Sequence, residues 1–539
     1  MAATYTVLDW AVFIAYGLLL LISGWWVNRK KVSNSSDYFL GGNTMPMWMV
    51  AVSVLATSQS AATFLGGPDM GYRGDLSYLA TNIGAFIAAF FVIVYLIPKF
   101  YQYKVFTVYE LLEQQIGPKA KKYAGVMYLF GRLFASGARL YMAAIAVAMI
   151  LFGNIDSDSV VISTIIISII GLLFSVFGGV RSVIYSDVIQ AIVYVSAALF
   201  VIYFLYLAIP ADFSQIIAVL QHPNAEEQSK LALLKFDMDF SGSGVFNFWS
   251  TITGFVLLNI ASFGLDQDMT QRVLTCKTAK EGSKALLLSV FMVIPVMFLF
   301  LIIGLLLYVF YQRPDLMFSN STVQAIQTFD GEKVTIFMWY VLNEIPAGVR
   351  GLVTIGIIAA ALSTLNSGLS SMSSVIVQDI YRPFIEKRSA KNKGKLYLDS
   401  HFVKAGKVSM VIVATALAGM AILSFYWQQY SDMPLLTFAL SVMLFSYSGL
   451  LGVYFTALFT KRGSEQSVLA ALIVGFITTL LMQPYIQSLY LPVKMQFDLA
   501  FTWKLCIATF ISTLICMLSK RELLTVKEEN MQLNGKVCD

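Results

Sequence analysis

The stretch AVSVLATSQSAATFLGGPDMGYRG, residues 51–74, starts as an apolar helix and is then interrupted by polar and helix-breaking residues. Five hydroxyl and amide side chains fall between residues 57 and 63, and Gly66-Gly67-Pro68 follows them. Inside a membrane, backbone without helical hydrogen bonds is tolerated only where it is buried in protein or lines a cavity. Its free carbonyl groups can then bind ions. The stretch therefore predicts a membrane helix that is unwound near its middle.

A second interruption falls in TGFVLLNIASFGLDQDMTQR, residues 253–272, where Asn259 and Ser262 lie inside an apolar run. The two interrupted segments are the second and the seventh of the spans that we expect, so they are five positions apart in the order of the helices. This separation fits two inverted repeats of five helices with a binding site between them. The repeats would cover residues 47–209 and 246–459.

The composition of the chain sets its structural class. Of its 539 residues, 58% are hydrophobic and only 13% are charged, whereas a soluble domain carries about 25% charged residues. Many apolar runs reach about 18 residues, the length that predicts a membrane-spanning helix. We therefore expect an all-α polytopic membrane protein.

Several kinds of chemistry find no support in the composition. Four cysteines without a CxxC spacing and two distant histidines indicate neither a disulfide framework nor a metal site. The chain has no GxxxxGK[ST] loop, so we do not expect transport driven by ATP. No nucleophile constellation points to an enzyme, and no organic cofactor is expected. A net charge of +6 fits basic cytoplasmic loops and requires no nucleic-acid partner.

We expect thirteen spans in one transmembrane domain over residues 1–519, followed by a cytoplasmic tail at 520–539. Basic residues gather in alternate loops, for example at Arg29-Lys30-Lys31 and between Arg382 and Lys395. Because cytoplasmic loops carry the excess of Lys and Arg, the N-terminus is expected outside and the C-terminus inside. The expected spans are 7–27, 47–68, 76–101, 122–152, 159–178, 184–209, 246–266, 283–312, 347–380, 404–427, 434–459, 466–486 and 499–519.

A further polar stretch, IIAAALSTLNSGLSSMSSVIVQDIY at residues 357–381, lies between apolar runs. Four of its serines, from Ser363 to Ser374, follow an i, i+4, i+7, i+11 spacing and therefore line one helix face. Ala360 and Asn366 lie close to that face. Small residues with hydroxyls also let helices pack closely, which is enough to explain the other two serines. For the stripe itself, close packing and the binding of a cation by oxygen ligands both stay open.

Three of the charged residues inside or at the ends of expected spans are candidates for a functional role. Asp187 is either a first-turn acid that the helix dipole favours or an ion ligand on an exit path. Arg132 and Arg139 are seven residues apart and share one face of the fourth span. An arginine in a membrane usually faces the bundle interior. Three roles therefore stay open for Arg132 and Arg139: binding an anionic substrate, pairing with a carboxylate, or extending to the membrane surface.

From about residue 7 to 465 the chain resembles the sodium/solute symporter family. The motifs that carry the resemblance are DYFLGG (37–42), ATSQSAATF (56–64), GGVRSVIYSDVIQ (178–190), DQDMTQR (266–272) with Asn259, and the serine-rich stretch that ends in QDIY (378–381). The resemblance implies a LeuT-like fold of two five-helix inverted repeats, with one extra N-terminal helix and further C-terminal helices. It also implies alternating access with sodium as the coupling ion.

In this family a sodium ion lies between the first and the eighth core helices. By resemblance, its ligands here are the backbone carbonyls of Ala56, Gln59 and Ala360 and the hydroxyls of Ser363 and Thr364. Sialic acid transporters of the family hold a second sodium nearby. The positions that match it, which also lie on the expected exit path, are Asp187, Ser363, Asn366 and Ser367. Asn366 stands where that subgroup has a serine.

The resemblance also implies a substrate site near the middle of the membrane. The family's galactose transporter uses a glutamate and a lysine, and their positions here are Asn82 and Phe291, which argues against a galactose-type site. The pattern is closer to the carboxylate site of the sialic acid members, although the arginine is displaced by about one turn. The implied substrate contacts are Ser60, Thr63, Asn82, Arg139, Asn259 and Ser262, with Phe64 and Phe263 as gates.

These features predict a sodium-coupled symporter of the plasma membrane that imports a sugar, an acidic sugar such as sialic acid, or a monocarboxylate. Its partners would be that solute, sodium and the lipid bilayer, and the oligomeric state stays open. The alternatives are a neutral-sugar symporter, a channel or a proton-coupled carrier of the same fold. The neutral Ser363 and Thr364 argue against proton coupling. A solute sensor usually carries a signalling domain, and the segment after Lys520 is too short for one.

Overall fold

The computed structural model describes residues 5–27, 29, 34–223, 228–317, 328–329, 332–333, 335–391, 399–428 and 435–521. By length and composition, nine helices of these residues could cross a membrane, or up to 11 if each of two bent helix pairs forms one span. Two further apolar helices, Leu444–Phe459 and Phe501–Met517, are shorter. The prediction of an all-α polytopic fold is confirmed, and the count of thirteen spans stays a prediction.

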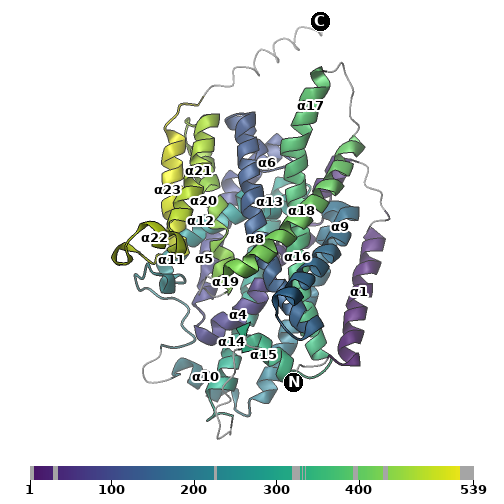
Figure 1. Cartoon of the computed structure of the whole chain (residues 1–539), viewed down its shortest axis with the longest axis vertical. Coiled ribbons are helices and arrows are strands. Elements are labelled where there is room, and N and C mark those ends of the chain that lie inside the picture. Colours follow the sequence, from purple (N-terminus) through teal and green to yellow (C-terminus); the bar gives the residue numbers. More distant parts are fainter. Residues whose placement is uncertain are drawn as a thin grey trace.

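The helices form an elongated bundle (Figure 1). In the first half of the chain they are α1 Val7–Val27, α2 Ser35–Leu40, α3 Met47–Ser58, α4 Ala61–Arg73, α5 Ser77–Tyr95, α6 Ile97–Tyr103, α7 Glu110–Gln115, α8 Pro118–Phe152, α9 Ser157–Ala208 and α10 Phe213–Gln221. In the second half they are α11 Phe248–Ile252, α12 Gly254–Ile260, α13 Gln267–Val273, α14 Ala279–Gln312, α15 Ile336–Asn343, α16 Val349–Val375, α17 Arg382–Lys391, α18 Asp399–Gln428, α19 Leu435–Ser441, α20 Leu444–Phe459, α21 Glu465–Leu481, α22 Pro484–Tyr490 and α23 Phe501–Met517.

Short irregular elements complete the chain. Residues Gly41–Asn43, Gly242–Gly244 and Val493–Met495 form 3-10 turns, and Ala261–Leu265 and Ile376–Tyr381 form π-helical segments. Two strands of two residues, β1 Thr328–Phe329 and β2 Glu332–Lys333, pair antiparallel.

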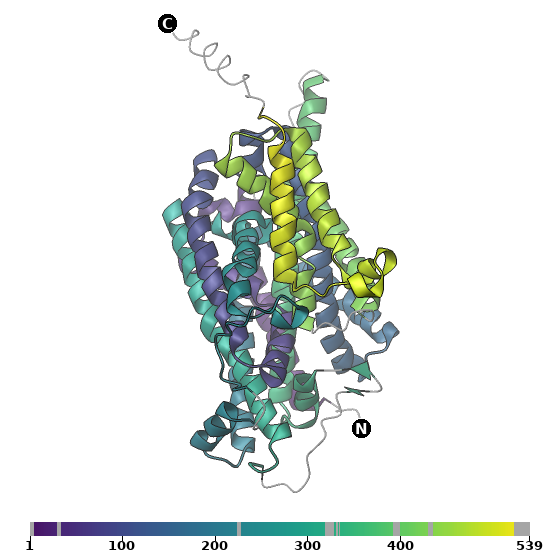
Figure 2. The ribbon, with the colours of Figure 1, turned by 90° about the vertical axis from the view of Figure 1, so that its left-hand side faces the viewer.

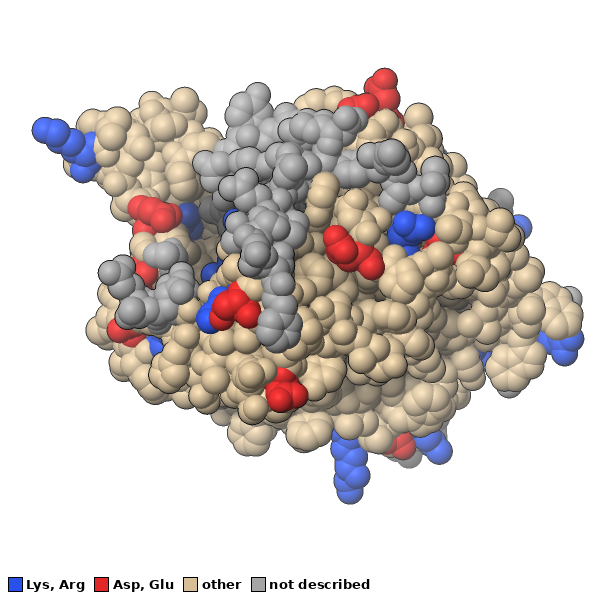
Figure 3. All heavy atoms as spheres, turned by 90° about the horizontal axis from the view of Figure 1, so that it is seen from below, with Lys and Arg blue, Asp and Glu red and all other residues tan. Residues whose placement is uncertain are grey.

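The outer helices lie on opposite sides of the bundle. Helix α1 stands at one edge and packs against α9 and α16 (Figure 1). Helices α20, α21 and α23 pack together on the other side (Figure 2). The end of the molecule that carries α10 and α15 shows scattered acidic and basic side chains on a mostly uncharged surface (Figure 3).

The predicted break in the first interrupted span is confirmed, at a narrower place than the sequence indicates. Helix α3 ends at Ser58 and α4 starts at Ala61, while Gln59 (φ −90°, ψ 110°) and Ser60 (φ −112°, ψ 176°) are extended. The expectation that Gly66-Gly67-Pro68 takes part in the break is wrong, because these residues lie inside α4. Glycines in this region instead allow α4 and α14 to approach closely.

The closest approach of these two helices is at Gly304. A methyl group on Gly304 would lie 2.1 Å from the carbonyl oxygen of Pro68. We expect Gly304→Val to lower stability by about 1–3 kcal/mol, as overpacking does, measured as thermal unfolding of the purified protein. Gly419→Val in α18 is the matched control, since nothing lies within 4 Å of its Cβ position. Equal unfolding temperatures for the two variants would contradict this packing.

The second predicted interruption is confirmed as well. Helix α12 passes into the π-helical segment Ala261–Leu265, and Asp266 (φ −86°, ψ 116°) is extended before α13 begins. A π-helical turn carries an extra residue and is frequent at functional sites. Helix α13 packs against α3, so the two interrupted segments meet inside the bundle.

The spans expected at 159–178 and 184–209 correspond to the two parts of α9, Ser157–Val176 and Gly178–Ala208, which a kink at Gly179 separates. Gly179 has φ +60°, and a Cβ there would lie 2.3 Å from the carbonyl oxygen of Tyr38. Because the helix resumes directly after this kink, Asp187 lies about two turns inside it and is fully buried. The hypothesis of a first-turn acid is therefore wrong for Asp187.

Candidate functional site

A cavity of about 120 Å³ lies where the two interrupted segments meet α5, α8 and α14. The first break, the π-helical segment and the face of α5 supply its polar lining. The polar residues that line it, apart from Arg132, are Ser58, Gln59, Tyr78, Thr81, Asn82, Arg139, Asn259 and Ser262. Four of the predicted substrate contacts, from three different helices, are thus brought together at one cavity.

Arg139 is a positively charged residue in the lining of this cavity. It is only 8% exposed, and its Nη2 lies 3.3 Å from the sulfur of Met443. Within the described part of the chain, no carboxylate pairs with it. Arg139 also borders a small void that Ser60 and Thr364 line. Since burying an unpaired charge is costly, this guanidinium is suited to an anion that enters the cavity.

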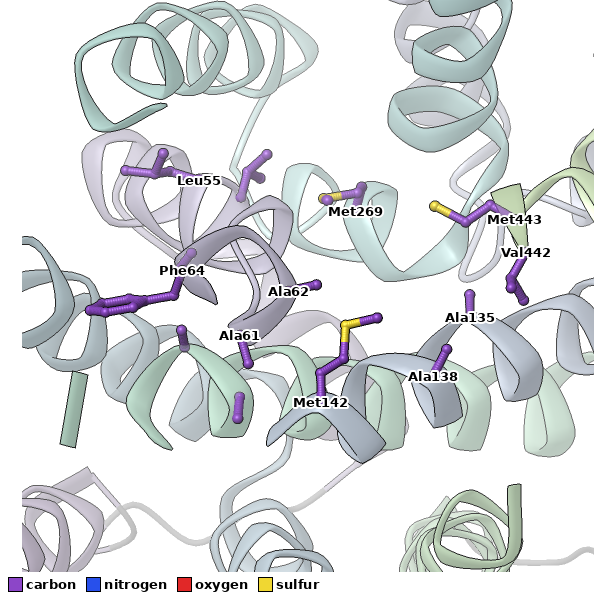
Figure 4. Packing of buried hydrophobic residues seen from close by; sticks show 14 of the residues in the cluster. Leu55, Ala61, Ala62, Phe64, Ala135, Ala138, Met142, Met269, Val442 and Met443 are labelled. Atoms are coloured by element: carbon purple, nitrogen blue, oxygen red, sulfur yellow. The ribbon is translucent and has the colours of Figure 1, made fainter. Parts of the chain in front are cut away.

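The remaining predicted substrate and gate residues differ in whether they line the cavity. Phe263 lines the cavity, whereas Ser60 lines only the small void. Thr63 is buried on α4, outside both linings. The ring of Phe64 lies 4.8 Å from that of Phe300 and points away from Met269 and Met443 (Figure 4). Phe64 therefore packs in the hydrophobic core.

The elements of the predicted sodium site also lie together. The carbonyl of Leu55 still accepts from the N–H of Gln59, but the carbonyl of Ala56, one residue later, has no helical N–H partner beyond the break. Helix α16 packs against α3. On α16, the hydroxyl of Thr364 donates to the carbonyl of Ala360 at 3.2 Å. The hydroxyl of Ser363 donates to Asp187 at 2.7 Å.

Asp187 joins α3, α9, α13 and α16. Besides Ser363, it accepts a hydrogen bond from Ser53, one turn before Ala56. It pairs with Arg272 of α13 at 3.3 Å. The residues predicted with it point elsewhere: Ser367 donates to Asp268 at 3.3 Å, and the Oδ1 of Asn366 faces Gly171 of α9. In this structure only Ser363 of that predicted set contacts Asp187.

Arg272 and Asp187 belong to a larger buried network. Arg272 also pairs with Asp268 at 3.2 Å, and Asp268 pairs with Arg132. Arg132 lies 3.1 Å from Asp266, which accepts a hydrogen bond from Tyr447. In their ordinary ionisation states, these three carboxylates and two guanidiniums sum to one net negative charge. Of the roles open to Arg132, the structure shows the pairing with carboxylates.

This network as a unit was not predicted from the sequence. DQDMTQR contains Asp266, Asp268 and Arg272, and the i, i+4 spacing of Asp268 and Arg272 favours an ion pair. Their partners on α8 and α9 are distant in sequence, so spacing alone could not reveal them. Tyr78, which lies one turn from Asn82 and lines the cavity, was not predicted either. The methionines around the cavity carry no sequence signal that distinguishes them from core residues.

Comparison with known proteins shows the family to which the chain belongs. A model of the family described as "SSF: Sodium:solute symporter family" matches residues 38–475. The chain belongs to this family. The symporter is 25% identical over 475 residues to the sodium/sialic acid symporter of Proteus mirabilis, covering 88% of this chain and 89% of that protein. It is 24% identical over 523 residues to the sodium/glucose cotransporter of Vibrio parahaemolyticus, covering 94% of this chain and 91% of that protein.

The fold is shared with a solved symporter structure. The substrate-bound, outward-open state of a sodium-coupled sialic acid symporter superposes with a TM-score of 0.77 at 22% identity, covering 96% of this chain and all of the other. The predicted transporter fold is thereby confirmed. The family assignment confirms a multi-pass, sodium-coupled solute symporter, in a family of transporters and not of enzymes. Sodium is its coupling ion.

Proposed function

We propose that this symporter imports a small organic solute that carries a carboxylate, and that Arg139 binds this carboxylate in the central cavity. The observation that carries the proposal is a buried guanidinium without a carboxylate partner in the described part of the chain, at a cavity between two broken helices. A carboxylate can form two parallel hydrogen bonds with such a group. Asn82, Asn259 and Ser262 would position the rest of the solute.

The sodium ion would bind between α3 and α16, at the carbonyls of Ala56, Gln59 and Ala360 and the hydroxyls of Ser363 and Thr364. The unpaired carbonyls at the end of α3 support this site. The buried charge network beside it has a net negative charge and would further attract a cation. Asp187, with Asn366 and Ser367, would serve as a second sodium site or as the exit path.

Sodium and substrate would stabilise each other. The void between Arg139 and Thr364 suggests how: a carboxylate bound at Arg139 would lie close to the sodium and compensate its charge. By linkage, sodium then raises substrate affinity by the same factor by which substrate raises sodium affinity.

Transport would follow by alternating access in the plasma membrane, with the N-terminus outside and the C-terminus inside. Sodium would first order the break between α3 and α4. The substrate would then bind in the central cavity that Tyr78 lines. After the outer side closes, the opening of the buried charge network would release sodium past Asp187. A membrane potential contributes about 2.3 kcal/mol per net charge moved per 100 mV, so it would drive uptake only if two sodium ions accompany each carboxylate.

Sodium binding can be tested without knowing the substrate. Sodium should raise the unfolding temperature of the purified symporter, since a ligand at 100 times its Kd stabilises by about 2.7 kcal/mol. Potassium at the same ionic strength should not. Thr364→Val and Ser363→Ala should each weaken the sodium effect about tenfold in apparent Kd, for a lost ligand worth about 1.4 kcal/mol.

The matched control is Ser373→Ala on the same helix. The hydroxyl of Ser373 donates to the carbonyl of Gly406 at 2.8 Å, on a contact with α18. This variant should keep the sodium effect of the wild type. The sodium site would be misassigned if Thr364→Val and Ser363→Ala kept it as well.

A further inference from the structure

A second, larger groove lies between α1, at the edge of the bundle (Figure 1), and the helices behind it. Its volume is about 710 Å³, and residues of α1, α8, α9 and α16 line it. None of the described residues in this lining is charged, and Tyr16 is the one among them with a hydroxyl. Each of the four helices contains a stretch long and apolar enough to cross a membrane. The groove therefore lies at the depth of the lipid chains.

Helix α1 contacts the bundle at both of its ends. Near its start, which is predicted to face outward, Asp9 accepts hydrogen bonds from the backbone N–H groups of Gly348 and Gly351, each at 2.8 Å. Near its other end, the ring of Trp26 lies 6.0 Å from that of Tyr185 on α9. The groove lies between these two contacts, so the middle of α1 is supported less than its ends.

Two glycines lie on the face of α1 that lines the groove. Gly17 and Gly24 are seven residues apart and therefore share one side of the helix. Glycines of membrane helices usually let two helix backbones pack closely. Here a methyl group on Gly17 would meet nothing within 4 Å, and one on Gly24 would meet only Phe174, at 3.9 Å. These glycines therefore widen the groove instead of forming a close helix contact.

The dimensions of the groove fit lipid chains. Because a protein cavity of about 150 Å³ accepts the six carbons of benzene, the volume of about 710 Å³ has room for on the order of thirty carbons. This is about the content of the two acyl chains of a phospholipid. The groove follows α1 from Trp10 to Trp25, a helix length of about 22 Å. One leaflet of the hydrocarbon core is about 15 Å thick, so an acyl chain can lie in the groove along its whole length.

A cation lies at the inner end of the groove. Trp25 lines this end, and the guanidinium of Arg29 lies 3.8 Å from the centre of its ring. Arg29 is exposed and begins the run Arg29-Lys30-Lys31, which is predicted to be cytoplasmic. Tryptophan is enriched at the level of the lipid headgroups, and the cytoplasmic leaflet carries anionic lipids that attract basic residues. The guanidinium is therefore placed to bind a lipid phosphate.

We propose that an anionic phospholipid of the cytoplasmic leaflet binds between α1 and the bundle, with its acyl chains along Gly17 and Gly24 and its phosphate at Arg29. The lipid supplies the packing that the middle of α1 lacks. It also contacts α16, where Leu362 lines the groove directly before the predicted sodium ligand Ser363. The groove shares no lining residue with the central cavity, so this proposal does not depend on the nature of the transported solute.

Photo-crosslinking of the full-length symporter tests the proposal. The probe is a phosphatidylglycerol with a diazirine in one acyl chain, added to the purified protein in detergent micelles. Cross-linked peptides should come from α1 and from Ser157–Val176 of α9. Unlabelled phosphatidylglycerol should compete about fivefold better than phosphatidylcholine with the same chains, as expected for one basic residue near the phosphate. Equal competition by the two lipids, or labelling spread evenly over the outer helices, would overturn the proposal.

Gly17→Phe tests the place of the acyl chains. The phenyl ring would occupy the groove and displace several buried CH₂ groups of the lipid, so labelling should fall by about tenfold or more. Gly419→Phe in α18 is the matched control, since a Cβ at Gly419 also meets nothing within 4 Å and Gly419 does not line the groove. Equal labelling of the two variants would show that the chains bind elsewhere.

Arg29→Gln tests the place of the phosphate. This variant should lose the preference for phosphatidylglycerol over phosphatidylcholine, whereas Arg388→Gln, at an exposed arginine of α17, should keep it. A preference that persists in Arg29→Gln would contradict the assigned phosphate contact. Native mass spectrometry of the purified wild type should show retained phospholipid. A bound polypeptide in its place would make the groove a protein interface and overturn the proposal.

Discussion

Arg139→Gln is expected to raise the KM for carboxylate uptake by at least about thirtyfold while leaving the protein folded. Truncating one partner of a buried charge pair costs about 2–5 kcal/mol in binding, and about 2 kcal/mol corresponds to about thirtyfold. Because no carboxylate in the described residues pairs with Arg139, its removal leaves no protein charge uncompensated. The unfolding temperature without substrate should therefore stay the same or rise.

Arg132→Gln is the contrasting variant on the same helix face. It removes the partner of Asp266 and Asp268, so we expect a lower unfolding temperature and less folded protein. Arg139→Lys keeps the charge and should retain part of the uptake. If Arg139→Gln kept the wild-type KM for the transported carboxylate while Arg132→Gln raised it, the carboxylate anchor would have to move to Arg132.

Arg272→Met is expected to open the bundle at the end that carries Lys277 and Lys280. Arg272 is fully buried and pairs with Asp187 and Asp268, and breaking a buried ion pair costs about 3–5 kcal/mol. Cys276, one turn further along, is also fully buried. In a chain whose other three cysteines are replaced by serine, Cys276 should react much faster with a maleimide after this substitution.

Arg350→Met supplies the control for this experiment. Arg350 is buried and pairs with Asp9 of α1 at 3.2 Å, away from the two broken helices. This substitution should destabilise the docking of α1 without changing the labelling of Cys276. Adding Asp187→Asn to Arg272→Met should recover part of the lost stability, because paired sites couple. Additive effects of the two substitutions would show that they do not form a pair.

Much of the fold could be predicted because it depends on local patterns in the sequence. Apolar length, polar residues inside apolar runs and the spacing of the two interruptions all point to two repeats with breaks. The position of the first break was harder, since Gly66-Gly67-Pro68 looks more disruptive than Gln59-Ser60. Gly67 instead allows α4 to pack closely on α14, and this depends on a partner helix that a local pattern does not contain.

The candidate site was less predictable for the same reason. Arg132 and Arg139 have the same residue type and share a helix face, yet one is paired twice and the other has no carboxylate partner in the described residues. What separates them is α13, which is distant in sequence. Likewise, nothing local distinguishes Phe64, which packs in the core, from Phe263, which lines the cavity. For the same reason, the methionines of the cavity lining could not be predicted from the sequence.

The central claim is that sodium and a carboxylate are transported together through the site between the two broken helices. The most direct test measures radiolabelled sodium uptake into proteoliposomes that is driven only by an inward gradient of the best-transported carboxylate, with proton gradients dissipated. We expect sodium to accumulate against its own gradient in the wild type, and not in Arg139→Gln or Thr364→Val. Carboxylate entry without sodium movement, or with equal sodium movement in all three proteins, would contradict the account.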